Sequence, residues 1–101
     1  METIEKTRLA DLLNKKVEDL TFSVRVRYGC GVLEIESIYD LVIYYTKNET
    51  QIKKFFDKEG RKEVRRFIRQ NGLNNFQGSK EKIINQLNNL KTLINCPVTL
   101  N

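Results

Sequence analysis

The chain of 101 residues contains no histidine and only two cysteines. Without histidine it lacks the commonest general base and the commonest metal ligand. Cys30 and Cys96 lie far apart and form no Cys-x-x-Cys motif, and two isolated cysteines do not make a zinc site on their own. We therefore expect a protein that is not an enzyme and holds no metal or cofactor. Two reduced thiols are favoured, with a disulfide as the alternative.

Long apolar runs are also missing. No run approaches the roughly 20 residues that a membrane helix needs, and the start at Met1–Glu5 is acidic, unlike a secretory signal. We expect a cytoplasmic protein that does not associate with membranes. By its length the chain is one domain over residues 1–101, able to bury roughly 65 % of its unfolded surface in one modest core.

Positive charge is concentrated in the second half of the chain. Residues 1–50 carry seven Lys/Arg and nine Asp/Glu, a net charge of −2, whereas residues 51–101 carry eleven and four, a net charge of +7. A basic half beside a slightly acidic half favours a polyanion bound to one face. A basic soluble protein without such a partner is the alternative.

Residues that cap helices recur along the chain, followed by apolar residues at helical spacing. A weak pattern over residues 3–13 predicts a helix with four candidate buried residues: Ile4, Leu9, Leu12 and Leu13. The hydroxyls of Thr21 and Ser23 predict the cap of a second helix. We expect that helix to end near Cys30, because Gly29 and Gly31 flank it.

Two capping patterns lie close together in the middle of the chain. Ser37 and Asp40 form the first, which begins a helix carrying Ile38, Leu41, Val42 and Tyr45. Thr46 and Glu49 form the second, which predicts a helix with Ile52, Phe55 and Phe56 on one side. Residues 42–45 alone would fit a strand, but the caps and the helical spacing on both sides favour helix.

The basic half predicts one strongly charged helix. Gly60 separates this helix from the preceding one, and residues 61–71 place three apolar side chains on one face: Val64, Phe67 and Ile68. Gly72 suits the left-handed residue after the last turn, and Leu73 then folds back onto the helix.

After a polar linker over residues 74–78, Ser79 caps a last amphipathic helix that ends at Pro97. Its apolar stripe consists of Ile83, Ile84, Leu87, Leu90 and Ile94. We expect the stripe to be buried on the chain's own core, with contact to a second copy as the alternative. The elements together predict an all-α fold, a compact bundle of four to five short helices.

A family resemblance rests on one stretch of the chain. The positions that carry it are Val17, Asp19, Leu20, Ser23, Val24, Arg25, Ile35, Ile38, Asp40, Leu41 and Val42. In this pattern the stretch resembles the carboxy-terminal domain of the bacterial RNA polymerase alpha subunit, and the likeness extends over residues 11–73. Residues 79–96 form an additional amphipathic helix outside it. The resemblance implies a SAM-like architecture with a helix-hairpin-helix-like element and a transcription-associated domain that binds DNA and catalyses nothing.

The resemblance implies that Arg25 is the main DNA contact, reaching into the minor groove of A·T-rich sequence. The narrow A·T minor groove has an enhanced negative potential that attracts arginine. Arg27 lies about 200° further round a helix and is expected to contact DNA only secondarily. Tyr28 occupies a DNA-contacting position where the family usually has asparagine.

A second implied DNA contact is the string Gly60-Arg61-Lys62, which resembles the family's Gly-basic-Lys turn. Such a turn presents backbone N–H groups to a phosphate at a helix N-terminus. Arg65 continues the basic face, which consists of Arg61, Lys62, Arg65, Arg66 and Arg69. Glu63 replaces the family's serine and repels a phosphate unless it points away. A helix boundary with solvated charges is the alternative.

The resemblance also implies a protein partner, RNA polymerase or its sigma subunit. Asp19 matches an acidic position that the family uses against sigma, while Thr21 replaces the acidic residue usually found two positions later. The alternative function is a protein–protein adaptor on the same helical fold without DNA binding.

Overall fold

The computed structural model describes residues 3–95, and the burial of side chains over residues 4–93. The elements of this range are α1 (Thr3–Leu13), a 3-10 helix η1 (Val17–Asp19), α2 (Val24–Val32), α3 (Ile38–Lys47), α4 (Glu49–Phe55), α5 (Lys58–Gln70) and α6 (Lys80–Asn95). The all-α fold is confirmed, with six α-helices within residues 3–95 rather than four or five, because the weak pattern over residues 3–13 forms a complete helix. Within residues 3–95, no helix is long and apolar enough to cross a membrane.

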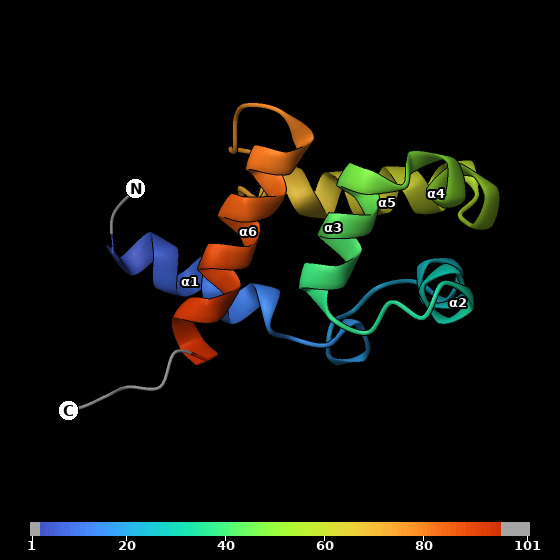
Figure 1. The fold of residues 1–101 in the computed structure, drawn as a ribbon. Helices are drawn as coiled ribbons and strands as arrows, with labels where there is room; N and C mark the ends of the chain where they lie inside the picture. Colours follow the sequence, from blue (N-terminus) through green and yellow to red (C-terminus); the bar gives the residue numbers. More distant parts are fainter. Residues whose placement is uncertain (1–2, 96–101) are drawn as a thin grey trace.

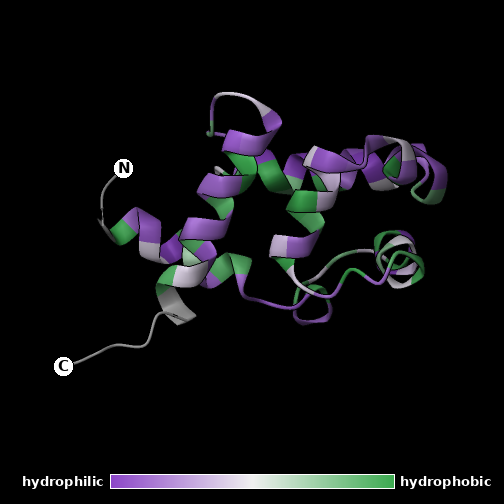
Figure 2. Ribbon diagram, in the orientation of Figure 1, coloured by the Kyte–Doolittle hydropathy of each residue, from purple (hydrophilic) through white to green (hydrophobic). Residues whose placement is uncertain are grey.

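The helices pack as two groups that share one hydrophobic core. In Figure 1, α1 and α3 lie against α6, while α2 packs against α4 and α5 at the other end of the molecule. Apolar side chains from both groups meet in the core, among them Leu13, Val26, Leu41 and Val64, each fully buried. Figure 2 shows the matching pattern, with hydrophobic stripes turned inward and hydrophilic faces outward.

Helix α6 closes the core at the end of α1 and α3. Leu87 and Leu90 are buried, which confirms that the stripe packs on the chain's own core. The Asn14 side chain donates to the Lys91 carbonyl at 3.1 Å and adds a polar link from the end of α1. The Ser79 hydroxyl accepts from the Lys82 N–H at 3.3 Å, as predicted for the cap. Three features of the predicted end lie outside the described residues: the Ile94 side chain, Cys96 and Pro97.

The prediction for Ile4 in α1 is wrong. Leu9 and Leu13 are fully buried and Leu12 is half-buried, but Ile4 is 81 % exposed. Five residues separate Ile4 from Leu9, which at 3.6 residues per turn turns the two side chains about 140° apart. Only one face of α1 can lie against α6 and α3, so Ile4 points away from it.

The glycines of α2 do not end the helix. It continues to Val32, and its C-terminal turn closes at Glu34, whose φ of 59° is left-handed. Gly29 is buried, and a β-carbon added there would lie 2.9 Å from the ring of Phe56. The glycine at this position therefore permits close approach of α2 to the end of α4. A β-carbon at Gly31 would meet no atom within 4 Å.

The capping box between Ser37 and Asp40 is confirmed, and residues 42–45 are helical. The second predicted cap is wrong. The Thr46 hydroxyl donates to the Val42 carbonyl at 2.9 Å inside α3, which runs on to Lys47. Helix α4 follows Asn48 without a side-chain cap.

Gly60 does not separate two helices. Helix α5 begins at Lys58, and the Asp57 carboxylate caps it by accepting the Gly60 N–H at 2.7 Å. Gly60 is therefore in the first turn of α5. At the other end the predicted stop is confirmed, since Gly72 has a φ of 73° and the Leu73 N–H donates to Ile68 at 2.9 Å.

Candidate nucleic-acid interface

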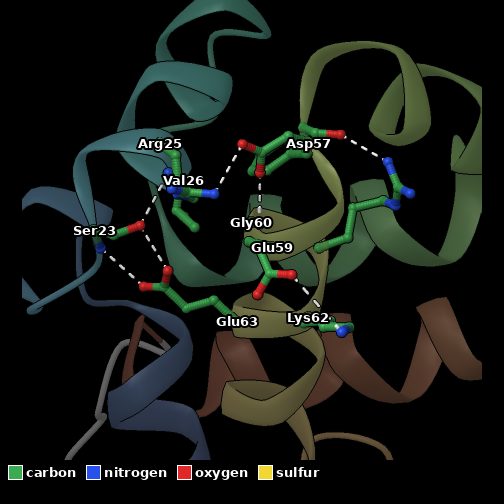
Figure 3. A network of polar contacts seen from close by, with 10 residues as sticks. Ser23, Arg25, Val26, Asp57, Glu59, Gly60, Lys62 and Glu63 are labelled. Atoms are coloured by element: carbon green, nitrogen blue, oxygen red, sulfur yellow. Dashed lines mark hydrogen bonds and ion pairs between the residues drawn. The ribbon is translucent and has the colours of Figure 1, made fainter.

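The first turn of α2 is fastened to α5 by a pair of short hydrogen bonds. The Glu63 carboxylate accepts the Ser23 N–H at 2.8 Å and the Ser23 hydroxyl at 2.6 Å. The Ser23 oxygen in turn accepts from the Val26 N–H at 3.4 Å as the helix cap. Figure 3 shows Glu63 turned toward Ser23. These hydrogen bonds hold the Glu63 carboxylate against the start of α2 and fix the backbone next to Arg25.

Arg25 lies against the start of α5. Its Nη1 donates to Asp57 Oδ2 at 3.0 Å, while the second oxygen of Asp57 caps the Gly60 N–H (Figure 3). The Arg25 and Asp57 side chains remain 49 % and 56 % exposed. The sequence prediction that the Gly60 N–H faces a phosphate needs correction, because Asp57 already occupies that donor. Gly60 itself is buried.

A groove separates α2 from α4 and the start of α5, and we call it the Arg25 groove. Its helical side chains are Val24, Arg25 and Tyr28 from α2, and Lys53, Lys54 and Phe55 from α4. Asp57 and Arg61 line it at the start of α5. The described lining thus has four cationic side chains and one carboxylate. A cationic groove of this kind attracts polyanions.

Apolar and aromatic surface lies among these charges. Tyr28 is 69 % exposed and Val24 is 82 % exposed, one helical turn apart on α2. Phe55 is half-buried on α4, with Lys54 Nζ 5.4 Å from the centre of its ring. The groove therefore offers an exposed ring beside cations.

Arg61 has a structural contact within the groove. Its Nη1 donates to the Phe56 carbonyl at 2.8 Å, at the end of α4. The Arg61 carbonyl accepts from the Tyr45 hydroxyl at 3.3 Å, and burial raises the pKa of Tyr45 to about 12. These contacts fix the connection between α4 and α5.

The remaining predicted DNA contacts do not line the Arg25 groove. Arg27 donates to the Leu20 carbonyl at 2.8 Å and lines a separate depression on α2, as its angular offset from Arg25 predicts. Lys62 pairs with Glu59 at 3.8 Å beside Arg25. Arg65 lines another depression with Tyr45, Arg69 and Phe76. The structure thus divides the basic face of α5 and does not place Arg65 in the Arg25 groove.

The two residues of the predicted protein contact are both exposed. Asp19 ends η1, and Thr21 lies beside α5 in a depression with Arg66 and Gln70. The two therefore belong to the surface that leads into α2.

Sequence reasoning missed the contribution of α4. Lys53 and Lys54 precede Phe55 and Phe56 directly, so two cations adjoin two aromatic rings. Phe56 is buried, so only the Phe55 ring is partly exposed beside these cations; lysines next to an accessible ring are a feature of nucleic-acid surfaces and point to this helix.

The described residues contain no group of three or more His, Cys, Asp or Glu side chains placed to hold a metal ion. Cys30 is a free, buried thiol, and burial raises its pKa to about 11. A thiol in such surroundings is poorly reactive, because the thiolate is the nucleophile.

Comparison of the chain with protein-family models gave no match, and comparison with curated proteins and with solved structures gave none either. The candidate function therefore depends on the geometry of the Arg25 groove.

Proposed function

We propose that this protein binds double-stranded DNA through the Arg25 groove, with Arg25 inserted into the minor groove of A·T-rich sequence. The observation that carries the proposal is the position of Arg25, half exposed on the first turn of α2, in a groove with three further cations and one carboxylate. A narrow minor groove attracts an arginine presented in this way.

The mounting of Arg25 supports the proposal. The bonds between Ser23 and Glu63 fix the first turn of α2 against α5, so the arginine backbone is ordered before DNA arrives. Pre-organisation lowers the entropy that binding would otherwise lose. Because the Glu63 carboxylate accepts both hydrogen bonds from Ser23, its negative charge is held toward Ser23.

The biological role we propose is that of a non-enzymatic accessory protein of transcription. It follows from the resemblance to the alpha-subunit carboxy-terminal domain, in which DNA binding and contact with polymerase go together. Exposed Asp19 and Thr21 lie on the segment that leads into α2 and are the proposed contact with RNA polymerase or its sigma subunit.

One observation favours a second candidate, a protein–protein adaptor that does not bind DNA. Arg25 is already paired with Asp57, and the Gly60 N–H is already capped. An arginine and an N–H group that are already bonded within the chain bind a phosphate backbone less strongly. The two candidates differ in their response to salt and to the removal of Arg25.

The deciding experiment is fluorescence anisotropy with an A·T-rich and a G·C-rich duplex across a salt series. Arg25→Ala is expected to weaken binding to the A·T duplex about 10- to 150-fold, the range for hydrogen bonds to charged groups, and to abolish the A·T preference. Arg27→Ala is the matched control, because it removes the same charge from the same helix outside the groove. Its expected effect is below about 3-fold.

Salt dependence gives an independent measure. The log–log slope of affinity against salt should be steep for the wild type and shallower by about 0.9 for Arg25→Ala. Equal, weak binding to both duplexes that Arg25→Ala leaves unchanged would contradict DNA binding and favour the adaptor.

A further inference from the structure

Insertion of Arg25 into a minor groove makes no use of the exposed apolar surface of the Arg25 groove. Tyr28 and Val24 lie one turn apart beside Arg25, and each exposes more than two thirds of its surface. An arginine side chain reaching into a duplex does not require an exposed ring next to it. Insertion of Arg25 therefore does not explain why the Tyr28 ring is exposed in the groove. The ring is either a second binding surface or a solvated side chain.

The ring is held on a rigid support. Its neighbour in the chain, Gly29, packs directly on buried Phe56, which begins the connection from α4 to α5. The same connection is fixed by Arg61, which donates to the Phe56 carbonyl. The helices that carry Tyr28 and the two lysines are consequently packed in a fixed arrangement.

Lys53 and Lys54 supply the charge opposite Tyr28. Both are exposed, and both line the groove that Tyr28 lines from α2. A cationic groove with an aromatic platform is the combination that holds single strands of nucleic acid, since every base has a π-face and every nucleotide has a phosphate. In an intact duplex, by contrast, neighbouring bases cover those faces.

We propose that the Arg25 groove also binds a single strand of nucleic acid, with an unpaired base stacked on Tyr28 and the phosphates held by Lys53 and Lys54. This activity goes beyond duplex binding, because it uses a ring that a closed duplex cannot engage. The charge of the groove selects a polyanion, and the ring selects one whose bases are free.

The test uses the absence of tryptophan from the chain. Tyr28→Trp introduces a single reporter at the proposed platform, whose fluorescence a stacked base quenches. The probe is a single-stranded oligothymidylate of about 12 nucleotides, within the usual site sizes of such grooves. The A·T-rich duplex is titrated in parallel at the same salt concentration. Saturable quenching by the single strand is the expected result.

Affinity measurements complete the test. Tyr28→Ala should weaken binding of the single strand about 5- to 150-fold, the range for the loss of one stacked base. Tyr28→Phe should bind the strand within about 2-fold of the wild type, because the ring remains. Ile4→Ala is the control for removing an exposed apolar side chain, since α1 lies at the other end of the molecule (Figure 1).

The outcomes separate the two proposals. Quenching by the strand without duplex binding would leave the single-strand site standing and remove minor-groove binding. Duplex binding with A·T preference, but no quenching and no effect of Tyr28→Ala on the strand, would overturn the single-strand site alone. Binding of neither nucleic acid would overturn both and direct the search to an acidic protein partner.

Discussion

Replacing Asp57 by asparagine should strengthen DNA binding, although it removes an ion pair. Asp57 has two separate contacts, since one oxygen accepts from Arg25 at 3.0 Å and the other accepts the Gly60 N–H at 2.7 Å. Asparagine keeps an oxygen for the cap and is as good as aspartate at that position. It loses the charge that attracts Arg25. Asp57→Asn therefore releases the arginine while α5 keeps its first turn.

The size of the effect follows from the exposure of the pair. Both side chains are about half exposed, and an ion pair in such a setting contributes about 0.2–1 kcal/mol. If Arg25 must leave Asp57 to enter DNA, that free energy is recovered in the variant. The expected gain in affinity is then about 1.4- to 5-fold. The free energy of unfolding should fall by about 0.5–2 kcal/mol, since the helix N-terminus also loses a favourable charge.

The assay is anisotropy with the A·T-rich duplex at fixed salt. Glu49→Gln is the matched control, because it removes the same charge from an exposed position in the first turn of α4. In the Arg25→Ala background, Asp57→Asn should change affinity less than about 1.5-fold. Weaker binding by Asp57→Asn, or a gain equal to that of Glu49→Gln, would refute the idea that DNA and Asp57 compete for Arg25.

Two further predictions concern stability. Gly29→Ala should lower the free energy of unfolding by about 1–3 kcal/mol, because its β-carbon would lie 2.9 Å from the Phe56 ring. Gly31→Ala, two residues along α2 in open space, should raise it by about 0.5–1 kcal/mol; urea denaturation giving the same sign for both would contradict the packing described. Burial raises the pKa of Cys30 from 9.0 to about 11, so between these pH values the unfolded chain loses the thiol proton while the folded protein keeps it. The free energy of unfolding is therefore unaffected by Cys30 below pH 9 and falls as the pH rises to 11. Urea midpoints across that window should fall for the wild type and fall less for Cys30→Ala, and parallel curves would contradict the assignment.

The predictions that succeeded depend on local interactions. The capping box between Ser37 and Asp40 and the stop at Gly72 each close within a few residues, so the pattern of side chains is enough to place them. The apolar stripe of α6 succeeded for a related reason. A helix with one apolar face must bury that face, and the core of its own chain is the nearest partner.

The predictions that failed were decided by more distant contacts or by helix phase. Gly29 looked like a helix stop, but it permits contact with Phe56 from another helix. Gly60 looked like a break, but Asp57 begins the helix three residues earlier. Ile4 has the right residue type but the wrong angular position on α1. In each case the residue type fits more than one local structure, and the contacts or the helix phase decide between them.

The candidate site likewise combines features set by local sequence with features set by contacts between distant residues. Sequence alone determined that this chain forms capped, amphipathic helices with a basic second half and an arginine at the start of the second helix, because charge, capping and periodicity are local properties. Only the tertiary structure decided which charges meet. Arg25 pairs with Asp57 across 32 residues and Ser23 with Glu63 across 40, while the basic face of α5 is divided between depressions. The physical reason is that the packing of one helix on another sets the direction of each side chain, and this packing depends on shape across the whole core.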